Sequence, residues 1–234
     1  MNLLALDTAT EACSAALLIG DDIIERSEIA PRRHAELILP MIESLLGEAG
    51  ISRRRIDAIA VGRGPGAFTG VRLAISVAQG LALGLDVPVV PVSSLAALAQ
   101  DAPTDIDAPI LAVIDARMGE IYAGAFRRSA DGLVSAIGSE SVGPASRLLL
   151  PQTATLRGQN WCVLGTGWSA YEDALSAQLP SPLYADGTRY PQAHAIARLA
   201  KPQLAAGRGV AAEFALPVYL RDKVALTLEE QRAR

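Results

Sequence analysis

Short apolar runs separated by polar turns open the chain. The runs cover residues 3–7, 13–19 and 23–28, and the turn between the last two is Gly20-Asp21-Asp22. Runs of strand length that are joined by turns rich in glycine and aspartate are typical of neighbouring antiparallel strands. The first thirty residues therefore predict a β-meander.

A helical period follows Pro31. Apolar residues then recur at steps of three and four, namely Leu37, Ile38, Met41, Ile42, Leu45, Leu46 and Ala49. Gly47 and Gly50 suit the C-terminal end of this helix. Pro40 lies inside the pattern and lacks the N–H that a helix interior needs. Either the first turn is irregular, or the helix begins near Pro40.

Strands and helices alternate from residue 56 onward. Residues 56–61 and 87–92 are predicted strands, and between them a helix runs from about residue 69 to residue 83, where Gly84 ends it. Ser93 or Ser94 caps a short helix over residues 95–100. A meander followed by alternating strands and helices predicts a mixed α/β layer.

Composition changes over residues 101–109, which are rich in aspartate and proline, and we place a lobe boundary there. The N-terminal lobe is residues 1–101 and the C-terminal lobe residues 102–234. Beyond the boundary we expect strands at residues 110–115, 121–127, 133–137 and 161–164, and helices near residues 169–178 and 191–204. The last ten residues are polar, and we expect them to be loose. A chain of 234 residues suits two lobes of roughly 110 each.

Charge and composition argue against several classes of protein. A net charge of −4 and a pI of about 5.3 disfavour a basic nucleic-acid surface, and 5 Tyr, 3 Phe and 2 Trp are few for a base-stacking platform. Mean hydropathy is +0.27, but the most apolar window, residues 74–90, is broken and shorter than the ~20 residues of a membrane span. No signal peptide is recognisable, and two widely separated cysteines fit a reducing compartment. We expect a cytoplasmic protein without a membrane segment.

The turn after the first strand is the first candidate site. Asp7, Thr8 and Thr10 lie where an actin-like ATPase holds magnesium-bound phosphate. Phosphate binding normally needs a glycine in such a turn, so that backbone N–H groups can reach the phosphate, and residues 7–10 contain none. Two interpretations stay open. The turn is a vestigial nucleotide site, or these side chains tie it down through bonds to backbone N–H groups, which we favour.

Residues 62–70 form a glycine-rich loop between a predicted strand and a predicted helix. The loop resembles a phosphate cradle, and Gly66 and Gly70 would then belong to the vestigial nucleotide site. However, it matches neither common glycine motif for phosphate and contains no lysine. We favour close packing, because small residues repeat every four positions and would let another helix approach. These residues are Gly70, Ala74, Ala78 and Ala82.

Residues for metal or nucleophilic catalysis are scarce. His34 and His194 are far apart in the sequence, and neither belongs to an HxxxH pair, so a histidine-built metal site is not expected. Asp115 and Arg117 suit a turn held by an ion pair better than a catalytic pair. No Ser-His-Asp or Cys-His set can be assembled. We expect no catalytic residue, no metal and no cofactor.

Several segments resemble the TsaB (YeaZ) family of glycoprotease-like proteins. They are residues 4–10, 34–40, 62–72, 115–122 and 217–221, and the string GRGPGAFTGVR among them is highly specific to this family and its catalytic paralogue. The resemblance runs essentially end to end. It implies an α/β, actin-like (ASKHA, ribonuclease H-like) fold of two lobes. It also implies a non-catalytic role in making N6-threonylcarbamoyladenosine at position 37 of tRNAs that read ANN codons.

The same resemblance implies partners. These are TsaD, the catalytic paralogue that binds metal through histidines on a helix of its first lobe, TsaE, the ATPase subunit, and tRNA, indirectly through the complex. In the corresponding region this sequence has only His34. The alternative function is an actin-like ATP-dependent phosphotransferase or a metallopeptidase in its own right. The lysine-free loop, the missing histidines and the glycine-free turn favour the non-catalytic subunit.

The two helices of the first lobe carry more apolar residues than one packed face requires. We therefore predict that they form the partner surface, as a four-helix junction with the matching pair of TsaD, and that the isolated chain forms a homodimer. The competing interpretation is that both apolar stripes are core. The predicted interface residues are Leu37, Ile38, Met41, Leu45, Leu73, Ala74, Val77 and Leu81.

Overall fold

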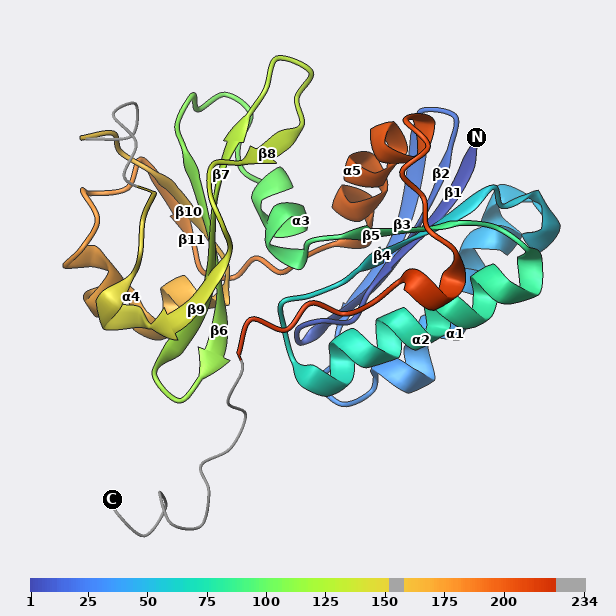
Figure 1. Ribbon diagram of the computed structural model, residues 1–234, viewed down its shortest axis with the longest axis horizontal. Helices are drawn as coiled ribbons and strands as arrows, with labels where there is room; N and C mark the ends of the chain where they lie inside the picture. Colours follow the sequence, from blue (N-terminus) through green and yellow to red (C-terminus); the bar gives the residue numbers. More distant parts are fainter. Residues whose placement is uncertain (152–157, 222–234) are drawn as a thin grey trace, which may run out of the picture.

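A computed structural model describes residues 1–151 and 158–221 and contains two β-sheets, shown in Figure 1. The first sheet has the strand order β3-β2-β1-β4-β5. Its antiparallel meander is followed by two strands parallel to β1. The strands are β1 (Asn2–Asp7), β2 (Ala12–Ile19), β3 (Asp22–Ile29), β4 (Ala58–Gly62) and β5 (Val89–Val92).

The second sheet repeats this connectivity. Its order is β11-β10-β6-β7-β8, with β6 antiparallel to β7 and parallel to β10, as β1 is antiparallel to β2 and parallel to β4. A further strand, β9, pairs with β7. The strands are β6 (Ile110–Arg117), β7 (Glu120–Arg128), β8 (Val134–Ala136), β9 (Ser141–Pro144), β10 (Cys162–Leu164) and β11 (Tyr184–Asp186). Two sheets of the same plan give the molecule the two lobes that the sequence predicts.

Helices cover the outer face of each sheet and fill the space between the sheets (Figure 1). α1 and α2 pack on the first sheet, α4 packs on the second, and α3 and α5 lie between them. The helices are α1 (His34–Ala49), α2 (Phe68–Leu85), α3 (Ser94–Gln100), α4 (Thr166–Ser176) and α5 (Ala193–Ala205). Short 3-10 turns are η1 (Arg53–Arg55), η2 (Ala145–Arg147) and η3 (Ala212–Phe214).

β1 shows why the central strands read as continuous apolar runs. Leu4 and Leu6 point to the core beneath α1 and α2, whereas Leu3 and Ala5 point to the core beneath α5. All four side chains are fully buried. A strand covered on both faces has no polar side to present, so it loses the alternation of a half-exposed strand.

The boundary predicted after residue 101 separates the strands of the two sheets but not the helices. α3 comes before the boundary and packs against β6, β7 and β8, whereas α5 comes after it and packs against β1, β2, β4 and β5. A single buried cluster runs from the first sheet through α3 and α5 into the second. The lobes therefore share a core, and α5 belongs to the first sheet despite its place in the sequence.

The structure excludes a helix start near Pro40, and it moves the predicted end of α2 beyond Gly84. α1 begins at His34, so Pro40 lies inside the helix, at an exposed position. α2 passes Gly84, and its C-cap is Asp86 in the left-handed region, with φ 56°. Ser93 accepts a hydrogen bond from the Ala96 N–H, which confirms the predicted cap of α3. The last ten residues lie outside the described residues.

The small-residue face of α2 packs on a sheet rather than on another helix, which corrects the prediction. Ala74, Ala78 and Ala82 are buried in the same core as Ile59 and Val61 of β4. Among the described residues, α2 is the one helix that by length and composition could cross a membrane. Its apolar character is accounted for on one side by this packing.

Candidate functional site

The turn that links β1 to β2 is held by its own side chains. Asp7 Oδ1 accepts a hydrogen bond from the Ala9 N–H at 2.7 Å, and Asp7 Oδ2 accepts one from Ser94 Oγ at 3.0 Å. Thr10 Oγ1 accepts from the Ala12 N–H at 3.4 Å. These bonds confirm the interpretation that the turn is tied down through backbone N–H groups.

The glycine-rich loop and this turn lie directly against each other. Thr8 Oγ1 donates to the Gly70 carbonyl at 2.7 Å. A Cβ atom on Gly62 would lie 1.8 Å from Asp7 Oδ2. A Cβ atom on Gly66 would lie 2.3 Å from the Ala9 carbonyl oxygen, and one on Gly70 would lie 2.0 Å from the Thr8 carbonyl oxygen. Contacts this close, with a buried carboxylate at Gly62 and with backbone at Gly66 and Gly70, leave no room for a side chain, so the glycines serve close packing, as predicted.

Asp7 does not fit the role of a ligand for metal-bound phosphate, the group that the fold class implies at this turn. The residue is fully buried, and both carboxylate oxygens are engaged within the protein. Burial raises the pKa of this carboxyl from 3.8 to about 6, against the opposing effect of the hydrogen bonds from Ala9 and Ser94. A carboxylate that is buried and has both oxygens engaged within the protein is not available to hold a cation at the surface of the turn.

A cavity of about 430 Å³ lies between the lobes, beside this turn and the N-terminus of α2. At its rim the Arg72 guanidinium lies 3.5 Å from the centroid of the Phe68 ring and donates to Tyr219 Oη at 2.6 Å. Val218 N–H donates to the Arg63 carbonyl at 2.9 Å, so the segment after η3 crosses the rim of the cavity. In the sequence, residues 217–221 stand out only by their resemblance to the TsaB (YeaZ) family.

Asp115 and Arg117 end β6, directly before the turn at Met118 and Gly119 that leads into β7. Arg117 has a left-handed φ of 64°, and the Asp115 carboxylate holds it by accepting from the Arg117 N–H and guanidinium, each at 2.8 Å. The predicted ion-paired turn is confirmed. Arg117 also reaches across the cavity to Glu11 at 2.5 Å, a contact between the lobes that no sequence pattern indicated.

The predicted interface residues divide into two groups. Ile38, Leu45 and Ala74 are at most 1% exposed and lie in the core beneath α1 and α2. They are unavailable to a partner, which corrects the prediction for these three, because a helix with two apolar stripes does not reveal which stripe faces the sheet. The other five predicted residues are partly buried, and all but Leu73 pack at the edge of that core. They are Leu37, Met41, Leu73, Val77 and Leu81.

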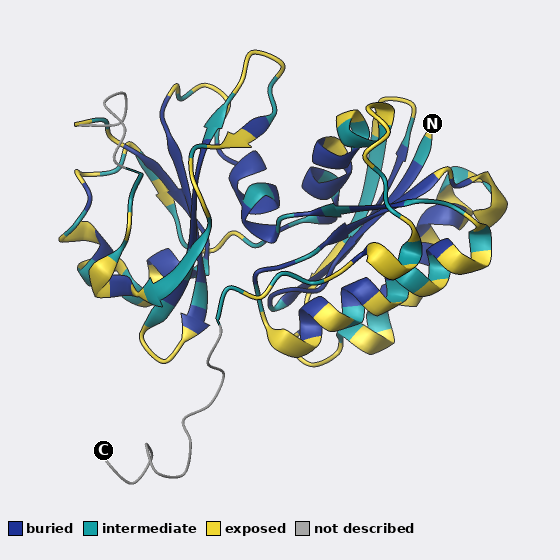
Figure 2. Cartoon of the chain, in the orientation of Figure 1, coloured by how far each residue is buried: buried dark blue, intermediate teal, exposed yellow. Residues whose placement is uncertain are grey.

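The outer side of α2 is uncharged and consists mainly of small residues beside one exposed leucine. Between Arg72 and Asp86 the helix has no charged residue. Four positions in this stretch are nevertheless exposed, namely Ser76, Gly80, Leu83 and Gly84. Figure 2 shows exposed positions along the side of α2 that faces away from the sheet. Leu83 is 78% exposed, and α1 adds Leu39 at 49%. Exposed apolar residues without charges are typical of a protein contact.

The two histidines do not make a metal site. His34 is the first residue of α1. His194 lies in the first turn of α5 and contacts Glu25 and Asp101. In the described part of the chain, no group of three or more His, Cys, Asp or Glu side chains could hold a metal ion.

Comparison with known proteins gives consistent matches. Residues 23–228 match the family model described as TsaD: tRNA N6-adenosine threonylcarbamoyltransferase. The Escherichia coli protein named tRNA threonylcarbamoyladenosine biosynthesis protein TsaB is 42% identical, and the match covers 96% of each chain. The protein of that name from Haemophilus influenzae is 38% identical over 96% of this chain and 95% of its own. The chain belongs to the TsaB (YeaZ) family.

A solved structure of a TsaB (YeaZ) family member confirms the fold. YeaZ from Pseudomonas aeruginosa is 47% identical, and it superposes with a TM-score of 0.85 over 94% of this chain and 99% of that one. The predicted two-lobed α/β architecture is therefore shared with this relative. These matches also confirm the resemblance of the five sequence segments to the TsaB (YeaZ) family.

Proposed function

We propose that this chain is a non-catalytic subunit in the synthesis of N6-threonylcarbamoyladenosine at position 37 of ANN-decoding tRNAs. In this proposal it binds and supports TsaD, the catalytic paralogue, and TsaE completes the machinery. tRNA is engaged through the complex, in the cytoplasm. The names of its full-length relatives support a role in this modification.

The uncharged outer side of α2 is the observation that carries the proposed partner contact. A solvent-facing helix normally places charged residues on its outer side, whereas α2 places Ser76, Gly80 and Leu83 there. Small residues let a second helix approach closely, and Leu83 supplies an apolar anchor. With the outer side of α1 included, such a junction would bury roughly 800 Å² per partner.

The alternative is a phosphotransferase or metallopeptidase that acts alone. The inward-facing Asp7 and the close packing of Gly66 and Gly70 argue against a nucleotide site of the usual kind. The purified chain with ATP and Mg²⁺ is expected to show no turnover above the no-protein control. Turnover that is lost in Asp7→Ala would establish the alternative instead.

The partner contact is tested with Leu83→Glu. The residue is exposed in the single chain, so glutamate there should leave the fold intact, whereas in an interface it would bury an unpaired charge. We expect binding to TsaD to weaken at least tenfold, about 1.4 kcal/mol, in a titration calorimetry experiment. The isolated chain should also change from a dimer to a monomer in sedimentation.

A matched control is Leu183→Glu. Leu183 is 56% exposed and lies beside β11 in the second lobe, away from α2. The same chemical change there should leave both the TsaD affinity and the oligomeric state unchanged. A Leu83→Glu protein that is folded by circular dichroism and binds TsaD as tightly as the parent chain would exclude α2 from the interface.

A further inference from the structure

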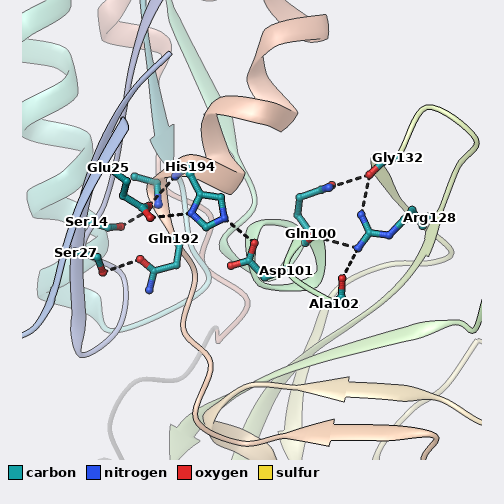
Figure 3. Close-up of polar contacts among 11 residues, drawn as sticks. Ser14, Glu25, Ser27, Gln100, Asp101, Ala102, Arg128, Gly132, Gln192 and His194 are labelled. Carbon is teal, nitrogen blue, oxygen red and sulfur yellow. Dashed lines mark hydrogen bonds and ion pairs between the residues drawn. The ribbon is translucent and has the colours of Figure 1, made fainter. Parts of the chain in front are cut away.

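His194 lies between two carboxylates, one on the first sheet and one at the end of α3, the helix that packs against the second sheet. Its Nδ1 is 2.9 Å from Glu25 Oε2 on β3, and its Nε2 is 2.8 Å from Asp101 Oδ1 at the C-cap of α3 (Figure 3). The Glu25 carboxylate also accepts the His194 backbone N–H at 2.9 Å. The three side chains are largely buried, with exposed fractions of 26% for His194, 24% for Glu25 and 13% for Asp101.

The Asp101 side of this cluster is fastened to the second sheet. Arg128 of β7 donates to the carbonyl oxygens of Gln100 at 3.1 Å, Ala102 at 2.8 Å and Gly132 at 2.7 Å. The Gln100 side chain donates to the Gly132 carbonyl at 2.9 Å and accepts from the Val134 N–H at 2.9 Å. The end of α3 is therefore held by β7 and by the start of β8.

The Glu25 side is fastened to the first sheet. Ser14 Oγ on β2 accepts from the Ala193 N–H at 3.0 Å, and Ser27 Oγ on β3 donates to Gln192 Oε1 at 2.7 Å. The N-terminus of α5 is thus fixed to β2 and β3. His194 is the side chain through which this polar network continues from the first sheet to the end of α3 (Figure 3).

We propose that protonated His194 is a charged lock that fixes the second sheet relative to the first. An imidazolium donates from both nitrogens, one hydrogen bond to Glu25 and one to Asp101, whereas a neutral imidazole can donate only one. Loss of the proton would therefore remove one of the two hydrogen bonds that the imidazole makes, either to Glu25 or to Asp101. The lock would then be broken on one side.

The surroundings favour the charged form. The hydrogen bonds to Asp101 and then to Glu25 raise the pKa of His194 from 6.5 to about 9, against the lowering effect of burial. Outside this triad, Arg128 of β7 interacts electrostatically with Asp101, and Arg198 of α5 interacts with Arg128. Because the folded pKa is above the unfolded value, the stabilisation is complete below pH 6.5 and is lost as the pH rises through about 9. At neutral pH the lock is closed.

The lock can be tested by measuring the distance between the lobes. Spin labels on Ser44→Cys of α1 and Glu172→Cys of α4 report on the first and second lobes, because both positions are exposed while the native Cys13 and Cys162 are buried. We expect a narrow distance distribution in the labelled parent chain at pH 7. His194→Gln, which keeps a polar side chain but no charge, should broaden or shift that distribution.

Lys201→Gln is the matched control. It removes another cation of α5, whose ion pair with Asp21 lies on the first lobe alone, so the distance distribution should not change. The labelled parent chain at pH 10 is a second route that needs no variant at His194, and it should reproduce the broadened distribution. A distribution that stays the same in His194→Gln and at pH 10 would overturn the lock, and the shared core alone would then hold the lobes.

Imidazole NMR provides an independent readout of the proton. The chain has two histidines, so His34→Gln identifies the His194 signal without touching the cluster. We expect His194 to titrate more than one pH unit above an ordinary histidine. Titration near pH 6.5 in the folded protein would contradict the proposal, because the site would then be largely neutral at pH 7.5.

Discussion

Asp7 ends β1 at the turn that the sequence suggested as a vestigial nucleotide site, and its neighbours give it a structural role. Gly62 lets the carboxylate lie against the β4 backbone, and Ser94 and the Ala9 N–H satisfy its oxygens. No solvent reaches it. The side chain has the chemistry of a ligand, but the bonds around it hold the β1–β2 turn to α3.

Asp7→Asn tests this structural role through pH. Burial raises the carboxyl pKa from 3.8 to about 6, so at pH 8 the folded protein holds an ionised group that it disfavours. Asparagine can keep the bond from Ala9 and carries no charge, so at pH 8 the variant should be more stable, by up to about 3 kcal/mol. Urea unfolding of both proteins at pH 8, 6 and 4 measures the difference.

The sign of the pH dependence is the decisive feature. As the pH falls from 6 towards 4, the folded parent protein takes up a proton that the unfolded chain does not, so its disadvantage relative to Asp7→Asn should shrink. A variant that is less stable than the parent chain at pH 8, and closer to it at pH 4, would mean that the ionised carboxylate is favoured in the fold.

At the scale of elements, α2 has two sides with opposite requirements. On the inner side, a Cβ on Gly70 would lie 2.0 Å from the Thr8 carbonyl oxygen. This oxygen belongs to the backbone, so relieving the clash would require the β1–β2 turn itself to shift. On the outer side, a Cβ on Gly80 would meet nothing within 4 Å. The inner glycine is needed for packing on the β1–β2 turn, whereas the outer one has no such role within the single chain.

The pair Gly70→Ala and Gly80→Ala should therefore give opposite results in one helix. Gly70→Ala should lower the free energy of unfolding by about 1–3 kcal/mol through overpacking. Gly80→Ala should raise it by about 1 kcal/mol, because alanine is the better helix former at an open position. Denaturant midpoints, compared at a concentration where each protein is monomeric, measure both. Equal shifts of the same sign would contradict the packing argument.

Elements that are long and have a clear pattern of apolar positions could be predicted from the sequence. β1, β2 and α2 are long and strongly patterned, and their predicted ranges agree with the structure within about two residues. β9 and β11 are too short to show alternation, and β9 contains glycine and proline. The hydrogen bonds that hold the β1–β2 turn at Asp7 could be predicted, because aspartate and threonine side chains commonly bond to nearby backbone N–H groups in turns. The contact between Glu11 and Arg117 did not, because nothing local encodes a pair that spans two lobes.

At the scale of the whole molecule, elements that are far apart in the sequence pack in the same layer. The segment after residue 190 returns to the first sheet, where α5 covers its inner face and η3 packs against α2. An isolated bridge between Val89 and Val210 adds a further contact to β5. The local period of α5 predicts an amphipathic helix but cannot say which sheet it covers. The predicted lobe of residues 1–101 is for this reason incomplete by itself.

A fragment of residues 1–101 should accordingly fail to fold cooperatively. It keeps α1 and α2 but leaves an inner face of the sheet uncovered, including Leu3, Ala5 and Leu18, which are at most 2% exposed in the whole chain. An exposed apolar sheet face of that kind favours aggregation or partial unfolding. We expect a poorly dispersed amide NMR spectrum and no sharp thermal transition. Joining residues 190–216 to the fragment through a flexible linker should restore both, because α5 then covers the sheet again. A fragment of residues 1–101 that gives a dispersed spectrum and a sharp transition without this addition would show that the first lobe is an independent folding unit.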